Sequence, residues 1–161
     1  MTTLEQQLER ARENLAAHPT NRALRRLLTI KGRLGIWDPR MHLFFGVPTD
    51  VTADVKRFIA RGYGRGLVPT ATTNGQHAPG SFHFQHRAAD MGVRTDEIGT
   101  ARAARKLVRF QRAQFRRFRR TGAVELIGPD ETRVVLRAVA TRLAPHDPLA
   151  VQHDNHVHGA F

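Results

Sequence analysis

The sequence predicts an α+β domain, in which a small, mainly antiparallel sheet is flanked by helices and preceded by an N-terminal helical hairpin. Two observations carry this prediction. Apolar residues recur at helical spacing over residues 3–35 and 95–122, whereas short apolar runs bounded by turn-forming residues are typical of strands at 66–72 and in the last 40 residues. The 161 residues, 40% hydrophobic and 25% charged, suffice for about one globular domain with its own core.

The first helical region is expected to be a hairpin. Leucines recur at helical spacing on both sides of "HPTN", where Pro19 breaks the pattern. The segment "GIWDPRM" then interrupts the helical pattern, so we place a boundary near Trp37. Residues 1–36 are predicted to form an N-terminal helical segment and residues 37–161 the main domain.

The next elements are predicted to alternate between strand and helix. The apolar run "HLFFGV", residues 42–47, is compatible with a short strand. From Thr49, capping-type residues open a helix with apolar residues on one face, and glycines end it. The run "GLVPTAT", residues 66–72, then predicts a strand.

A long helix is expected over residues 95–122, ended by Gly122. Arginines cover most of its surface, and its expected buried stripe consists of Ala104, Leu107, Val108, Phe115 and Phe118. Strands are predicted at residues 123–129 and 132–139, around a turn at Pro129, with the last strand over 153–161.

Composition limits the kinds of partner and site. The net charge of +12 implies affinity for a polyanion. The chain has no cysteine, so any metal must be held by His, Asp or Glu. No apolar run approaches the roughly 20 residues of a membrane span, and the start "MTTLEQQLERAREN" lacks the pattern of a signal peptide. We therefore expect a soluble protein without an export signal of its own.

Histidines and one aspartate gather in two short segments. The segment "SFHFQHRAAD" contains His83, His86 and Asp90, and the last nine residues hold a third of the nine histidines, namely His153, His156 and His158. In an extended strand, residues two apart point to the same side about 6.6 Å from one another. One of the last two histidines can then bind a metal while the other reaches water bound to it. A mononuclear zinc site can be assembled in this way from two parts of a fold.

Two ligand sets are open. A hydrolytic zinc site keeps three protein ligands and one water, whose pKa falls to about 7. His83, Asp90 and His158 would supply two imidazoles and one carboxylate. If residues 82–90 were helical, His83, His86 and Asp90 would share a face and form a rival set. The Phe82/Phe84 alternation after Pro79 favours strand and loop, and "HDNHVH" as a metal-scavenging tail is a third interpretation.

The same two segments resemble a known family. The run "SFHFQHRAAD" resembles the Ser-x-His-x-x-Gly-x-Ala-x-Asp signature of the zinc D-Ala-D-Ala carboxypeptidase family, which includes D-Ala-D-Ala dipeptidases and phage L-alanyl-D-glutamate endolysins. Ser81, His83, Ala88 and Asp90 match the signature. The run "HDNHVH" is similar to a His-x-x-His-x-His arrangement in the wider group that contains the penicillin-insensitive murein endopeptidases. The resemblance covers roughly residues 37–161.

This resemblance implies roles for individual residues. It makes His83, Asp90 and His158 the zinc ligands and places His156 or His153 in the catalytic shell. Two positions depart from the family pattern: His86 replaces the motif glycine, and Asn155 stands where many members have a carboxylate three residues before the last ligand. An amide cannot act as a general base.

The residues around the expected zinc ligands supply the candidates for the catalytic base and for substrate binding. Asp154 would lie about 13 Å along an extended strand from His158, which is too far unless the chain turns there. We therefore favour His156 as the base or transition-state stabiliser, and His153 second. The chain has no clear match for the arginine with which some members stabilise the oxyanion. Ser81 and Gln76 are the candidate substrate-binding residues.

The expected function is that of a zinc-dependent peptidoglycan peptidase, of the D-Ala-D-Ala carboxypeptidase or murein endopeptidase and endolysin type, used in phage lysis or cell-wall remodelling. The alternative is a non-catalytic phage structural or wall-binding domain that keeps a structural zinc. The Arg-rich run "RKLVRFQRAQFRRFRR" is either a plain solvated helix face or a surface that holds an anionic cell-wall polymer. Nucleic acid is disfavoured, because the stripe accounts for Phe115 and Phe118 and no helix-turn-helix or finger spacing is present.

Overall fold

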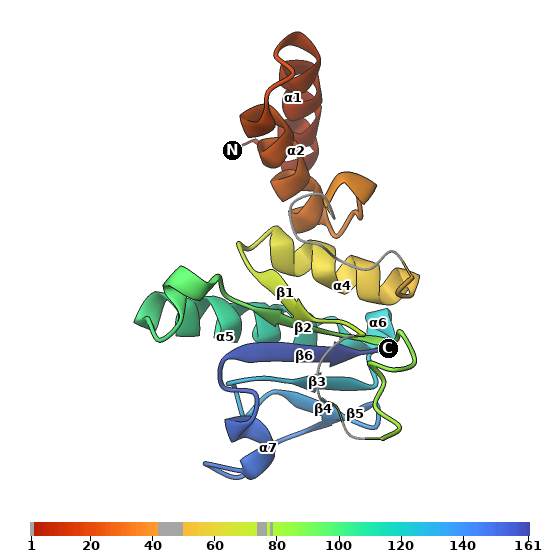
Figure 1. Ribbon diagram of the computed structural model, residues 1–161, viewed down its shortest axis with the longest axis vertical. Coiled ribbons are helices and arrows are strands. Elements are labelled where there is room, and N and C mark those ends of the chain that lie inside the picture. The colour runs from red at the N-terminus through yellow and green to blue at the C-terminus, as the bar shows by residue number, and fades with distance from the viewer. Residues whose placement is uncertain (1, 42–49, 74–76, 78) are drawn as a thin grey trace.

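The computed structural model describes residues 2–41, 50–73, 77 and 79–161, and over these residues the chain is an α+β domain, as predicted (Figure 1). Its antiparallel sheet has the strand order β1-β2-β6-β3-β4-β5. The strands are β1 (Val68–Ala71), β2 (Ala88–Gly92), β3 (Glu125–Ile127), β4 (Val134–Leu136), β5 (Val139–Thr141) and β6 (His156–Ala160). The last strand therefore lies inside the sheet, between β2 and β3.

The predicted N-terminal hairpin is confirmed, with helices α1 (Leu4–Ala17) and α2 (Asn21–Leu34). The side chain of Thr3 caps α1 in a reciprocal capping box, and that of Thr20 caps α2. Apolar residues of the two helices form a small core of their own, namely Leu8, Ala11, Leu27 and Ile30. The predicted boundary at Trp37 falls between α2 and the short 3-10 helix η1 (Pro39–Met41).

The predicted helix near Thr49 is also confirmed as α4 (Ala53–Tyr63), capped by Thr52. Its C-terminal end touches α2 backbone to backbone. A Cβ atom on Gly64 would lie 2.3 Å from the amide nitrogen of Arg33 and 2.5 Å from the carbonyl carbon of Gly32. Only glycine permits this approach, so Gly32 and Gly64 set how the hairpin packs against the rest of the chain.

We therefore expect Gly64→Ala to lower the free energy of unfolding by roughly 1–3 kcal/mol, because the added methyl group meets backbone that has little room to move. Gly32→Ala should have a similar effect, since its Cβ would lie 2.4 Å from the carbonyl oxygen of Ala60. Denaturant unfolding of both variants and of the double variant tests this expectation. Costs that simply add in the double variant would argue against a shared contact.

The helix predicted over residues 95–122 is wrong in its extent. The structure has a 3-10 turn, η2 (Thr95–Glu97), then α5 (Ala101–Phe115) and α6 (Phe118–Thr121). Gly122 ends α6 in the left-handed conformation, as predicted.

The predicted buried stripe of this helix is also partly wrong. Ala104 is exposed and Val108 only half-buried, while the buried residues of α5 are Ala103, Leu107, Phe110, Gln111, Ala113 and Gln114. The difference arises because a polar residue, Gln111, is buried in the core with its hydrogen bonds satisfied. The side-chain amide of Gln111 donates to the carbonyls of Asp130 and Arg133, and its oxygen accepts from the amide of Asp130. A satisfied glutamine can thus occupy a core position that a pattern of apolar residues leaves out.

Two strand predictions need correction. Residues 132–139 form not one strand but the hairpin β4–β5, in which Arg137 and Ala138 adopt positive φ values of 50° and 62°. This two-residue turn carries none of the Asn or Gly residues that usually signal it. The last strand begins at His156, because residues before it form the short helix α7 (Pro148–Val151) and a turn. The strand predicted at 42–47 lies outside the described residues.

The two faces of the sheet have different roles. Helices α4 and α5 cover one face, where Phe58 and Phe110 lie in the main core. Ala89 and Met91 of β2 and Val157 of β6 point into this core. Because side chains alternate along a strand, the residues between them project from the opposite face. That face carries the candidate site.

Candidate metal centre

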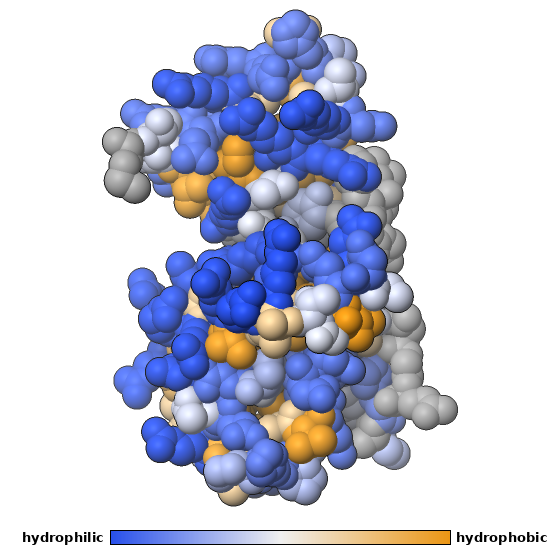
Figure 2. Space-filling view, turned by 90° about the vertical axis from the view of Figure 1, so that its left-hand side faces the viewer, coloured by the Kyte–Doolittle hydropathy of each residue, from blue (hydrophilic) through white to orange (hydrophobic). Residues whose placement is uncertain are grey.

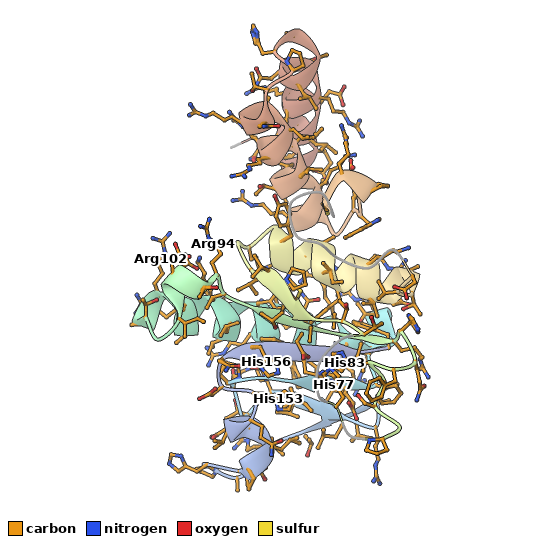
Figure 3. All side chains as sticks on the ribbon, in the orientation of Figure 1. His77, His83, Arg94, Arg102, His153 and His156 are labelled. Carbon is orange, nitrogen blue, oxygen red and sulfur yellow. The ribbon has the colours of Figure 1, made fainter. Side chains whose placement is uncertain are left out.

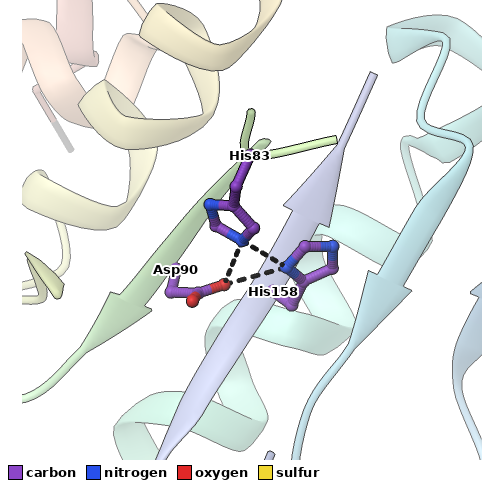
Figure 4. A group of neighbouring side chains, drawn as sticks. All are labelled: His83, Asp90 and His158. Atoms are coloured by element: carbon purple, nitrogen blue, oxygen red, sulfur yellow. Dashed lines mark hydrogen bonds and ion pairs between the residues drawn. The ribbon is translucent and has the colours of Figure 1, made fainter. Parts of the chain in front are cut away.

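Three side chains converge on the face of the sheet opposite to α4 and α5 (Figure 4). Asp90 of β2 and His158 of β6 are direct partners in the strand register. His83 comes from the turn before β2. His83 Nε2 lies 3.2 Å from His158 Nδ1 and 3.3 Å from Asp90 Oδ1, and His158 Nδ1 lies 2.8 Å from Asp90 Oδ1. Two parts of the chain separated by about 70 residues thus meet at one point.

This arrangement fits a metal ion. Donor atoms in a tetrahedral site with bonds of 2.0–2.1 Å lie about 3.3 Å apart, close to two of the three distances here. All three residues are buried, with exposed fractions of 2% for His83, 8% for Asp90 and 7% for His158. The group could therefore hold a metal ion. Two imidazoles and a carboxylate suit several divalent transition metals.

The far nitrogen of each imidazole is held by an acceptor. His83 Nδ1 is hydrogen-bonded to the carbonyl oxygen of Thr72, which directly follows β1. His158 Nε2 lies 3.2 Å from Oε2 of Glu125 on β3. A proton on each of these nitrogens leaves the lone pair of the other nitrogen facing the cluster, which is how outer residues orient metal-binding histidines.

The same contacts also make a charged hydrogen-bond network. Burial alone would raise the pKa of Asp90, but the hydrogen bonds with His158 and His83 outweigh it and hold that pKa well below its usual range. Burial alone would lower the pKa of His158, but its hydrogen bonds to Asp90 and Glu125 raise it to about 9. The cluster can therefore exist in a second state, in which a protonated His158 lies between two carboxylates and no metal is bound. A measurement of metal binding distinguishes this state from the metal site.

The two candidate catalytic histidines lie beside the cluster (Figure 3). His156 Nε2 is 3.9 Å from Asp90 Oδ2, and its Nδ1 donates to Oδ1 of Asn155 at 2.7 Å. His153 Nδ1 donates to the carbonyl of Leu149 at 2.6 Å, and its ring centroid is 4.8 Å from that of His156. Burial lowers the pKa of both, that of His156 to about 4, so both rings are neutral near pH 7. Asn155, which cannot be a base, instead orients His156.

The rival ligand set is not formed. Residues 82–86 are consecutive turns, so the expected loop is confirmed, whereas the strand expected from the Phe82/Phe84 alternation is wrong. His86 points away and its Nδ1 lies 2.7 Å from Asp50 Oδ2. Its φ of 59° is in the left-handed region, which glycine adopts more readily than other residues.

The remaining predicted residues have other surroundings. The hydroxyl of Ser81 accepts from the amide of His83 at 3.3 Å and so helps to fix the turn that carries His83. Gln76 lies outside the described residues. Asp154 is exposed on the turn before β6.

Sequence reasoning missed two residues of the site. Glu125 is one, and His77 is the other, whose ring stacks on that of His83 with centroids 3.8 Å apart and an interplanar angle of 4°. The alternation of Glu125 with the buried Leu126 indicates which face Glu125 takes, but not that β3 adjoins β6.

Comparison of the chain with protein-family models, with curated proteins and with solved structures gives no match. In the part of the chain that the structure describes, every helix is too short or too polar to cross a membrane.

Proposed function

We propose that the chain is a zinc-dependent peptidoglycan peptidase that hydrolyses a short cell-wall peptide bond, of the carboxypeptidase or endolysin type. The observation that carries the proposal is the buried cluster of His83, Asp90 and His158. In both imidazoles the nitrogen that faces away from the cluster is hydrogen-bonded to an acceptor. The resemblance of "SFHFQHRAAD" and "HDNHVH" to the signatures of zinc peptidases supports the same function.

Each residue of the site then has a definite task. Zinc, when bound, supplies a Lewis acid that polarises the scissile carbonyl and lowers the pKa of water. The carboxylate of Asp90 offsets part of the metal charge. His156, oriented by Asn155, accepts a proton at Nε2 and passes it to the leaving amine. His153 is close enough to hold His156 in place, since their rings are in contact.

A non-catalytic wall-binding domain with a structural zinc is the competing function. Structural zinc sites are closed by four protein ligands, whereas catalytic sites keep three and leave one position open. The described residues bring together three donors, which favours the catalytic assignment.

The test is incubation of the protein with purified peptidoglycan, with and without a chelator, followed by mass analysis of the released fragments. We expect chelator-sensitive release of fragments whose masses identify the bond cut. His156→Ala should keep the metal and slow cleavage by about 100-fold or more, the usual contribution of a general acid or base. The control is His18→Ala. His18 is the exposed C-cap residue of α1 and is far in sequence from His156. Cleavage by His156→Ala at the native rate would place the base elsewhere.

A further inference from the structure

A second site lies where the N-terminal hairpin meets the helices that cover the sheet. The molecule is indented between the hairpin and the rest of the chain, with hydrophilic residues on both sides (Figure 2). A pocket of about 460 Å³ is lined there by five cationic side chains, Arg33, Arg65, Lys106, Arg109 and Arg117, together with Leu4 and Gly64. We call these five residues the basic pocket. They come from α2, the end of α4, α5 and the junction of α5 with α6.

Three of the four arginines of the basic pocket are anchored by backbone carbonyls, and among the described residues none of these three forms an ion pair with a carboxylate. Arg33 Nε donates to the carbonyl of Gly64 at 3.3 Å. Arg65 Nη1 donates to the carbonyl of Arg61 at 3.1 Å, and Arg117 Nη1 to that of Ala113 at 3.0 Å. Each of these bonds uses one of the five N–H donors of a guanidinium. The side chains are thus held in position while most of their donors remain available.

The positive charge of the basic pocket is only partly balanced. Among the described residues, the one carboxylate in ion-pair contact with it is Glu97, 2.6 Å from Lys106 Nζ. The C-terminal ends of α2, α4 and α5 lie next to Arg33, Arg65 and Arg117, and each end offsets about half a charge. About half of the five charges therefore remain. Consistently, burial and repulsion from Arg117 lower the pKa of Arg65.

We propose that the basic pocket binds the phosphodiester groups of an anionic polymer without bases, such as a poly(glycerol phosphate) of the cell wall. Guanidinium groups match phosphate oxygens in a paired geometry, and several of them converge here on one concave site. Among the described residues, no aromatic side chain lines the pocket, so these residues offer nothing on which nucleic-acid bases could stack. The choice of a wall polymer, though not the phosphate chemistry, rests on the proposed function.

The test measures binding of a short synthetic poly(glycerol phosphate) to the whole chain by calorimetry at physiological salt. The pocket variant Arg65→Gln/Arg117→Gln should bind about tenfold more weakly or worse, since two charge-assisted contacts are lost. The matched control is Arg102→Gln/Arg105→Gln, which removes two exposed charges of α5 outside the pocket, and should bind like the wild type. The pocket variant is expected to fold, because it removes charges that repel one another.

Three outcomes overturn the proposal. Equal losses in the two double variants would show a general charge effect without a pocket. Inorganic phosphate or pyrophosphate that binds as tightly as the polymer would identify a small phosphate ligand instead. Single-stranded DNA that binds more tightly than the polymer would identify nucleic acid. Cleavage of soluble wall peptides that lack the polymer should be unchanged in the pocket variant, so this test and that of the proposed function fail separately.

Discussion

Asp90→Asn is expected to abolish stoichiometric zinc binding by the chain and, with it, any hydrolysis of peptidoglycan. The asparagine has the same shape but no negative charge, and its amide is a poor ligand for zinc compared with a carboxylate. Loss of an outer partner of a metal site costs 10- to 100-fold in affinity, and loss of a ligand should cost more. Metal analysis after dialysis and a zinc titration measure this effect.

The control for this variant is Asp96→Asn, which makes the same change of charge at an exposed residue near α5 and should leave zinc binding unchanged. Wild-type zinc affinity in Asp90→Asn would remove Asp90 from the ligand set. If the wild-type chain itself binds no zinc, the cluster is the ion-pair network in which His158 is protonated between Asp90 and Glu125.

Local sequence patterns were sufficient to predict the elements whose formation depends on residues close together in the sequence. The hairpin of α1 and α2 follows from its leucine spacing and from Thr3 and Thr20, whose side chains cap the two helices. The proximity of His83 and Asp90 was expected from the resemblance of a run only ten residues long, residues 81–90. Such features depend on residues within a few turns of one another, so their physical cause can be identified without knowing the rest of the fold.

Apart from the meeting of His158 with His83 and Asp90, which the resemblance implied, the contacts that depend on sheet order could not be predicted. Glu125 reaches His158 only because β3 lies next to β6, and Thr72 reaches His83 only because β1 lies next to β2. Nothing in the residues of a short strand specifies which strand will be its neighbour. Near His83 the loop was expected but its form was not. The residues expected to be a strand at Phe82 and Phe84 are turns, and His86 occupies a left-handed position without being a glycine.

Removal of the last four residues, so that the chain ends at Val157, is expected to abolish cooperative unfolding as well as zinc binding. These residues include every residue of β6 that pairs with β3, in the pairs Glu125–Ala160, Leu126–Gly159 and Ile127–His158. They also include three of the five β6 residues that pair with β2. Without them the sheet separates into β1–β2 and β3–β4–β5, and neither part retains a neighbour to cover its edge.

Two further chains separate the role of the strand from that of the ligand. His158→Ala keeps the strand and should lose zinc while unfolding in one transition. A chain that ends at Ala160 loses only Phe161, whose ring lies 5.6 Å from that of Phe58 and whose backbone oxygen accepts from Arg87. That deletion should lower the free energy of unfolding by about 1–3 kcal/mol, as for a partly buried aromatic side chain. Circular dichroism during denaturant unfolding and zinc analysis measure all three. A single transition at the wild-type midpoint for the chain ending at Val157 would show that β6 does not join the two parts of the sheet.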